Sequence, residues 1–357
     1  MWSISGNFAI CMICGVFVYC VAKEAEARVL ERKTMKTLKI ALIAFAMLGV
    51  VRVFSAIPLP EQPRPSNERM DWAEIVLCDQ KEQTIDIYDA GGSNVWRWCA
   101  KDDPNIPGDG KVGFLDNVAE AKPFAGGSKI GMVACGGRWA VVDRKRRRAC
   151  AWGKCTGWAH SIELVGSDVV AVVSTGGSGG NSLFLFDISG DAAMNPSQQK
   201  KSVLKFDSPH GLHYDGKLLW LVDTPGLHCC SISRNADGAP VAKVEKTWSF
   251  SELGVIHGHD LRPVPCATLL AMTTHEKILF FDMKTESWRK DMFIVKQDVK
   301  AFDPAPDGKS FLVTTAKTQW WTDSLEICTS GKKGDEALFT PSLVIPGAKI
   351  YKARWVW

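Results

Sequence analysis

The chain has 357 residues, of which 46% are hydrophobic and 23% charged, a composition typical of a globular protein with enough apolar material for a core. Its formal net charge of +4 comes from the N-terminal part, because residues 1–55 hold seven Lys or Arg and three Asp or Glu, which leaves 36 residues of each sign in the rest. A neutral domain of this kind argues against nucleic acid and against an anionic membrane surface as partners.

The first seventy residues precede the predicted folded domain. Residues 7–22 form an apolar run slightly short of a membrane span, and we interpret residues 1–34 as an upstream extension or apolar segment. Residues 57–70 carry four prolines and are typical of an extended linker. The folded domain is therefore predicted over residues 71–357.

Residues 35–56 have the layout of a secretory signal peptide. A basic start at Met35 is followed by the apolar residues 40–51 and by the small residue Ser55. The alternative is a membrane anchor, because Arg52 interrupts the expected cleavage region. We predict an exported protein, periplasmic or secreted, that contacts a membrane only through its N-terminal segment.

One unit of sequence recurs along the domain. It consists of a short extended segment, a turn and an apolar strand, and it is clearest at residues 158–175, 208–224 and 258–274, with fainter copies at 120–135 and 300–315 and a sixth, partial copy at 352–357. The first residues of the six copies are 40 to 52 positions apart: Glu120, His160, His210, His259, Lys300 and Lys352. A period of this size indicates a repeat fold, and each repeat holds about four strand-like runs, the size of one propeller blade.

The two ends of the domain are predicted to share one blade. Residues 74–99 contain three strand-like runs without an innermost strand, whereas residues 348–357 supply a single strand without partners. Pairing them would close the ring and remove open sheet edges. We therefore predict an all-β fold, a six-bladed β-propeller closed by its N- and C-terminal strands.

Three of the repeated positions carry histidine. Innermost strands border the central channel of a propeller, so His160, His210 and His259 are predicted to converge on the axis. Three neutral imidazoles from separate rigid elements are typical of a site for one divalent metal ion. A structural interpretation stands beside this one, because a repeat position also keeps its residue when the same hydrogen bond recurs in every blade.

Some further residues are predicted to belong to this site, and others are predicted to lie outside it. Glu120, Lys300 and Lys352 occupy the same repeat position as the histidines and would bind an anionic ligand or move protons. Trp158 lies two residues before His160 and would line the same pocket. Among the other histidines, His257 is an alternative ligand, His213 has the opposite parity and should point away, and His275 is given no role.

The repeat units resemble a known family. The runs IVLCDQKEQTIDIYD, HSIEL, HGLHYDGKLLWLVD and HDLRP and the closing KARWVW are similar to those of exported bacterial six-bladed propellers of unknown function. This resemblance covers about residues 71–357 and implies fold and export, but no reaction. The histidine trio alone is also similar to propeller enzymes that hold a metal with histidines from several blades, such as peptide-amidating lyases and oligogalacturonate lyases.

Two classes of function stay open. The first is a binding protein that holds a small molecule, glycan, sugar acid or peptide at the channel mouth, with exposed aromatic residues such as Trp158, Trp320 and Trp321. The alternative is a metal-dependent lyase or hydrolase in which the trio polarises a carboxylate or carbonyl group. No nucleophile elbow, phosphate loop or nucleotide fingerprint is present, so catalytic residues are not identified from the sequence.

Overall fold

The computed structural model describes residues 74–357 except 112, 309 and 330–337. The predictions for residues 1–34, 35–56 and 57–70 lie outside the described residues. Within the described part, no helix is long and apolar enough to cross a membrane.

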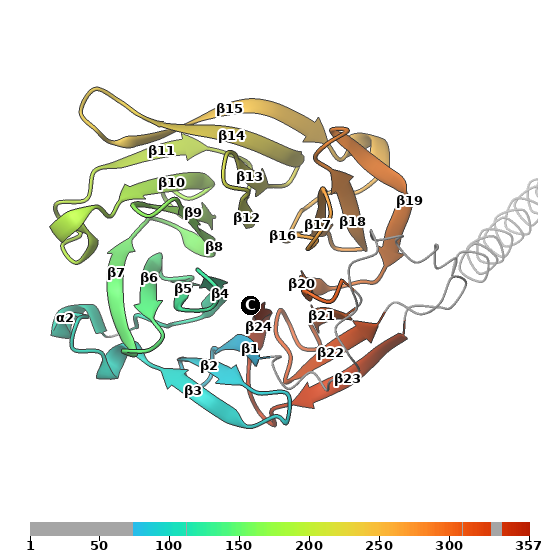
Figure 1. The fold of residues 1–357 in the computed structure, drawn as a ribbon, viewed down its shortest axis with the longest axis horizontal. Helices are drawn as coiled ribbons and strands as arrows, with labels where there is room; N and C mark the ends of the chain where they lie inside the picture. The colour runs from blue at the N-terminus through green and yellow to red at the C-terminus, as the bar shows by residue number, and fades with distance from the viewer. Residues whose placement is uncertain (1–73, 112, 309, 330–337) are drawn as a thin grey trace, which may run out of the picture. The chain divides into compact units, whose positions relative to one another are not determined.

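The described residues form six four-stranded antiparallel sheets arranged as blades around a ring (Figure 1). The first blade consists of β24 (Ile350–Val356), β1 (Glu74–Asp79), β2 (Thr84–Tyr88) and β3 (Asn94–Trp98), the second of β4 (Val118–Phe124), β5 (Lys129–Ala134), β6 (Arg138–Asp143) and β7 (Arg148–Lys154), and the third of β8 (Trp158–Val165), β9 (Val169–Thr175), β10 (Ser182–Asp187) and β11 (Lys201–Lys205).

The remaining three blades follow in chain order. The fourth consists of β12 (Gly211–Tyr214), β13 (Leu219–Val222), β14 (Gly226–Arg234) and β15 (Pro240–Ser249), the fifth of β16 (Asp260–Pro263), β17 (Leu269–Thr273), β18 (Lys277–Asp282) and β19 (Ser287–Val295), and the sixth of β20 (Val299–Pro304), β21 (Ser310–Thr315), β22 (Ser324–Thr329) and β23 (Leu338–Val344). Short helical turns lie in the connections: η1 (Ala100–Asp102), α2 (Gly108–Lys111), η2 (Gly190–Ala193) and η3 (Ser251–Leu253).

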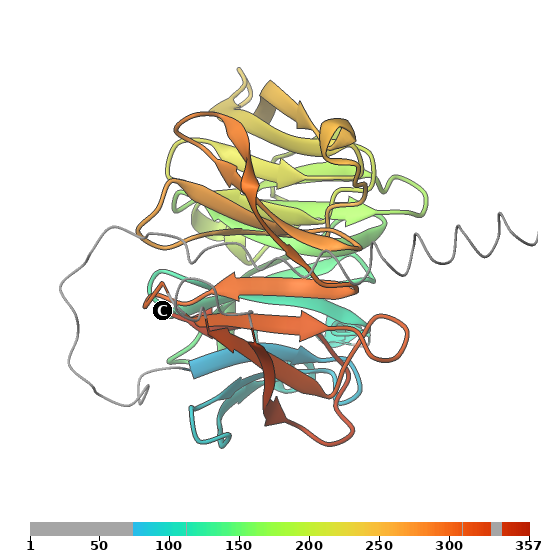
Figure 2. The ribbon, with the colours of Figure 1, turned by 90° about the vertical axis from the view of Figure 1, so that its right-hand side faces the viewer.

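The second strand of a blade is buried on both faces, as β9 shows. β9 has the sequence VVAVVST and is buried at all seven positions, so both of its faces are covered by neighbouring blades. β-branched residues favour such pleated, buried surfaces. Aromatic pairs join adjacent blades, for example Trp139 of β6 and Phe186 of β10, whose ring centroids lie 5.0 Å apart. The hydrophobic core is therefore distributed between neighbouring blades. Figure 2 shows the blades from the side of the ring.

The predicted closure of the ring is confirmed. β24 pairs antiparallel with β1, from Glu74 opposite Val356 to Asp79 opposite Ile350. A further backbone hydrogen bond joins the Gln80 N–H to the Lys349 carbonyl over 2.9 Å. The first blade therefore combines both ends of the domain, and the all-β, six-bladed prediction is correct.

Candidate functional site

Six innermost strands, β4, β8, β12, β16, β20 and β24, surround the ring axis (Figure 1). The structure brings the three predicted histidines together at one level of this axis. The ring centroids of His160 and His210 lie 4.4 Å apart, and those of His210 and His259 lie 5.0 Å apart. His160 belongs to β8, whereas His210 and His259 directly precede β12 and β16.

A fourth histidine extends this group toward solvent. The ring centroid of His275, in the turn between β17 and β18, lies 4.5 Å from that of His259. The Nε2 atom of His259 lies 3.3 to 3.4 Å from both ring nitrogens of His275, and His275 is exposed. We call His160, His210, His259 and His275 the histidine layer. The sequence gives no sign of this contact, because only the folded turn carries His275 to His259.

His257 lies at the edge of the histidine layer. Its ring centroid is 5.3 Å from that of His275, and its Nδ1 atom is 3.2 Å from the Thr224 hydroxyl. It contacts His275 rather than the predicted trio, and five of the seven histidines of the chain therefore gather at this end of the axis.

The histidine layer is held in its neutral form. Burial lowers the pKa of His210 to about 4, against the opposing effect of its hydrogen bond to Ser208. Burial also lowers the pKa of His160, with a further contribution from the charge of Lys352. Burial, His210 and Lys300 lower that of His259 in the same direction.

One hydrogen bond fixes the tautomer of His210. Its Nδ1 atom lies 2.7 Å from the Ser208 carbonyl oxygen, which only accepts, so Nδ1 carries the proton. In the neutral ring, Nε2 is then an acceptor with a free lone pair. The Nδ1 atoms of His160 and His259 are buried and have no hydrogen-bond partner among the described residues. Unpaired buried polar atoms are rare in proteins and mark a place where a partner is expected.

Lys300 lies at the same level of the innermost strands. It falls within the register shift between Val299 and Ala301 of β20, as His160 falls within the shift between Ala159 and Ser161 of β8. Such bulges leave one residue outside the ladder and re-aim its side chain. Burial lowers the pKa of Lys300, opposed by Asp298, and only 7% of the residue is exposed.

Glu120 occupies a different level from His160. In β4 the register shift lies between Val118 and Glu120, so Ala119 corresponds to His160 and Glu120 to Ser161. The predicted alignment of Glu120 with the histidines is therefore wrong by one residue. The Glu120 side chain is fully buried and accepts a 2.5 Å hydrogen bond from the Ser161 hydroxyl.

Next to the histidine layer lies a set of buried charges that we call the ion network. It holds four carboxylates and four cations: Glu120, Glu163, Asp260, Asp303, Lys122, Arg262, Lys352 and Arg354. Every one of these residues is buried, and all six innermost strands except β12 contribute at least one. The opposite charges balance, as the cost of burying ions requires.

The two cations of β24 tie the network across the axis. Lys352 Nζ lies 3.4 Å from the carbonyl oxygen of His160 and 3.4 Å from Asp260 Oδ1. Arg354 donates to Asp260 over 2.8 and 2.6 Å and also to Glu120. These contacts reach strands β4, β8 and β16, so both side chains occupy the axis itself. Lys352 and Glu120 are thus bound to other protein groups, not free to contact a ligand.

The charges of the network set the protonation of its acids. Burial alone would raise the pKa of Glu120, but Lys122, Lys352 and Arg354 hold it below its ordinary value. Burial likewise opposes Arg354 and Lys352 at Asp260, whose pKa is also lowered. Glu120 and Asp260 are therefore ionised, and the cations of the network neutralise their negative charge.

The charges of Lys122 and Arg262 act on His213, although the parity argument predicts that its side chain points away from the axis. Burial lowers its pKa to about 3, and the charges of Arg262 on β16 and Lys122 on β4 add to this effect. An innermost strand turns its edge toward the axis, so side chains of both parities stand beside it. His213 belongs to the level of the ion network and not to the histidine layer.

Comparison with known proteins identifies the family but no activity. A family model described as "Family of unknown function (DUF6528)" matches residues 37–357. The chain belongs to this family. The match agrees with the resemblance drawn from the sequence and leaves residues 1–36 outside it.

Other comparisons add little about this family member. No curated protein matches the chain. A crystal structure of the Myceliophteria thermophila Cps50 (Swd1) β-propeller domain is similar, with 9% sequence identity, a TM-score of 0.42, and coverage of 63% of this chain and 71% of that chain. The assignment of the fold rests on the six sheets described above.

The three tryptophans predicted to line the site make contacts of their own. Trp158, at the start of β8, is 57% exposed, and its ring packs on Gly176, where an added Cβ would lie 2.7 Å from Trp158 Cε3. The φ of +53° at Gly176 also favours glycine, so the β9–β10 turn is shaped to receive this ring. Trp320 is 47% exposed and donates to Gln80 over 3.2 Å, and Lys349 Nζ lies 4.9 Å from the Trp321 ring centroid.

The histidines touch through ring contacts and are not arranged around one point. Within residues 74–357, gaps excepted, no group of three His, Cys, Asp or Glu side chains has a geometry suited to a metal ion. The metal site at His160, His210 and His259 stays a prediction, and it would require rotation of the rings.

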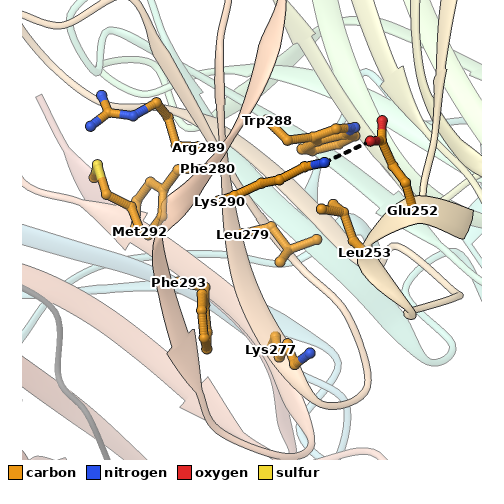
Figure 3. A pocket seen from close by; sticks show the side chains of 10 residues that line it. All are labelled: Glu252, Leu253, Lys277, Leu279, Phe280, Trp288, Arg289, Lys290, Met292 and Phe293. Atoms are coloured by element: carbon orange, nitrogen blue, oxygen red, sulfur yellow. Dashed lines mark hydrogen bonds and ion pairs between the residues drawn. The ribbon is translucent and has the colours of Figure 1, made fainter.

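A separate pocket lies in the outer part of the fifth blade (Figure 3). Apolar side chains such as Leu279 and Trp288 line it, and an ion pair of 2.8 Å between Lys290 and Glu252 spans one side. None of the residues of the histidine layer lines this pocket. It is formed by β18, β19 and η3 alone.

Proposed function

We propose that the protein is an exported β-propeller that binds an organic ligand, such as a glycan, sugar acid or peptide, at the end of the ring axis where the histidine layer meets solvent. His160, His210, His259 and Lys300 are its contacts, with Trp158 at the rim. One observation carries the proposal. Buried ring nitrogens of His160 and His259 have no partner among the described residues, whereas each carboxylate and each cation of the adjacent ion network has an ion-pair partner.

The arrangement supports binding chemistry in a simple way. Neutral imidazoles present lone pairs or N–H groups at fixed positions, and rigid strands hold them in place. Trp158 supplies a flat apolar surface suited to a sugar ring or an aromatic group. The ion network fills the axis behind the layer, so a ligand enters from the histidine side.

A ligand screen on the full chain tests the proposal. Sugars, sugar acids and short peptides are screened by thermal shift, and the site of each hit is located with ¹⁵N-labelled histidine. A ligand of this site shifts the resonances of His160, His210 and His259, and His210→Phe abolishes its binding. The matched control is His213→Gln, which lies three residues after His210 and outside the histidine layer, and which is expected to leave binding unchanged. Ligands that bind the His210→Phe variant as tightly as the unchanged protein would have their site elsewhere.

The second candidate function is a metal-dependent lyase or hydrolase. It is favoured by the hydrogen bond from His210 Nδ1 to the Ser208 carbonyl, because metal-ligating histidines usually donate their other ring nitrogen to such an acceptor. Elemental analysis of protein produced in metal-replete medium tests it. Stoichiometric zinc or manganese that disappears in His210→Phe supports this candidate, and protein free of metal excludes it under those conditions.

A further inference from the structure

Lys300 differs from the other buried cations along the ring axis. Lys122, Arg262, Lys352 and Arg354 each form an ion pair with a buried carboxylate. Lys300 is also buried, with 7% exposed against 0 to 1% for Lys122, Lys352 and Arg354. It forms no ion pair with any residue that the structure describes, and Asp298 is the carboxylate whose charge acts on it. The charge of the network is already balanced, so its carboxylates do not neutralise Lys300.

A buried ammonium without a partner is costly to the fold. Removing it from water without a counter-ion is among the most unfavourable arrangements of a side chain. An apolar residue at this bulge would fold more easily. Groups that lower stability in this manner are commonly kept for function, because binding sites present charges that the protein itself does not satisfy.

The position of Lys300 directs its charge to the histidine layer. In the third and sixth blades His160 and Lys300 lie in the bulge near the start of the innermost strand, and in the fourth and fifth blades His210 and His259 directly precede the first paired residue. The backbone N–H groups of His210 and His259 bond to Val222 and Thr273, the partners of the residues that follow them. These four side chains therefore stand around the axis at one level, as a cation beside three neutral rings.

The three neutral histidine rings and the single cation, Lys300, favour a ligand with matching chemical groups. His210 Nε2 is an acceptor, which suits a hydroxyl donor and repels a second anionic oxygen. Lys300 suits a carboxylate. The exposed face of Trp158 suits the carbon skeleton of a polyol or sugar.

We propose that the ligand of this site is a hydroxycarboxylate, an organic anion whose carboxylate pairs with Lys300 and whose hydroxyl groups donate to the histidine layer. This inference rests on the proposed function and narrows it to one chemical class. It distinguishes the site from one for neutral glycans and from one for multiply charged anions such as phosphate.

Matched pairs of acid and neutral compounds test the class. The full chain is titrated calorimetrically at constant ionic strength with glucuronate and glucose, gluconate and glucitol, and threonate and threitol. Inorganic phosphate serves as an anion without hydroxyl donors on carbon. At least one acid is expected to bind about tenfold to a hundredfold more tightly than its neutral counterpart, the strength of a charge-assisted hydrogen bond.

Variants of Lys300 identify the source of the preference. Lys300→Met is expected to remove the difference between acid and neutral compound without lowering the melting temperature, whereas Lys300→Arg keeps the preference. ¹⁵N-histidine spectra report whether each probe reaches the histidine layer, through the signal of His210.

The outcomes separate this inference from the proposed function. Equal binding of acid and neutral compound, with shifted His210 signals, would overturn the carboxylate class and keep the binding site. Binding of phosphate in preference to all three acids would do the same. Acid binding that leaves His210 signals unchanged and survives Lys300→Met would overturn both, and failure of all three acids to bind would overturn the hydroxycarboxylate class.

Discussion

The histidine layer and the ion network are neighbouring levels of one axis, but they solve the problem of buried polar groups in opposite ways. In the network each carboxylate has a cation, as Asp260 has Arg354, and the charges sum to zero. In the histidine layer the rings are neutral and the Nδ1 atoms of His160 and His259 lack partners, and the neighbouring Lys300 forms no ion pair with any described residue, although the charge of Asp298 acts on it. Networks that are satisfied internally hold structure together, whereas groups left unsatisfied are available to something else. This difference distinguishes the ion network, which holds the ring closed, from the histidine layer, which we expect to bind a ligand.

The largest expected effect comes from removing the strand that supplies the central cations. A chain ending at Gly347 loses β24, and with it both Lys352 and Arg354 and the pairing with β1. The carboxylates of the network would then be buried without partners while the ring is open. We expect no cooperative unfolding transition by circular dichroism. A melting curve like that of the full chain would show that closure does not depend on β24.

A single substitution tests the network without opening the ring. Arg354→Met leaves Asp260 and Glu120 buried without their main partner and should cost about 3–5 kcal/mol in free energy of unfolding. The control is Arg146→Met, which breaks the pair with Asp143 on a side chain that is 76% exposed and should cost less than about 1 kcal/mol. Urea unfolding measures both. Similar losses in the two variants would contradict a special role for the network.

Acid sensitivity provides a smaller effect at the level of the network. His213 faces Lys122 and Arg262, with Asp215 as the opposing charge, and its folded-state pKa of about 3 lies below the ordinary value of 6.5. Between these values the unfolded state binds more protons, so stability is complete above pH 6.5 and declines as the pH falls toward 3. The loss attributable to His213 should be about 2 kcal/mol at pH 5, relative to pH 7.

His213→Gln isolates this contribution from those of the other histidines. The variant should show a shallower decline in unfolding free energy between pH 7 and pH 5, measured by urea titration at several pH values. An unchanged pH profile would mean that His213 is protonated without penalty, and that its surroundings are more open than the structure indicates.

These two levels also differ in how well the sequence predicts them. Apolar second strands such as β9, the turn residues and the repeat distance are local signals, so the six blades and their closure follow from the sequence. The gathering of His160, His210 and His259 follows from the same repeat. Bulges are not visible in a count of residues, and a shift of one position was enough to place Glu120 at the wrong level.

The sequence contains a pattern that indicates the ion network, but the alignment of the repeats on their first residues does not reveal it. Charged residues stand at alternate positions of otherwise apolar innermost strands, as in Glu120 with Lys122, Asp260 with Arg262 and Lys352 with Arg354. Buried charges at such spacing require partners on other strands. Their pairing across the axis depends on the ring, and no local pattern gives it. His275 is similar, since its contact with His259 is made by a turn.

The smallest expected effect on stability is also the sharpest test of the comparison, because it concerns one lysine in each level. Lys300→Met removes a buried cation without an ion-pair partner and should leave the free energy of unfolding unchanged or raise it by about 1 kcal/mol. Lys352→Met removes a cation bound to Asp260 and to the His160 carbonyl, and should lower it. Urea unfolding at pH 7 compares the two variants. Equal destabilisation would mean that Lys300 is held by the fold as firmly as Lys352, and the argument that its charge is reserved for a ligand would lose its basis.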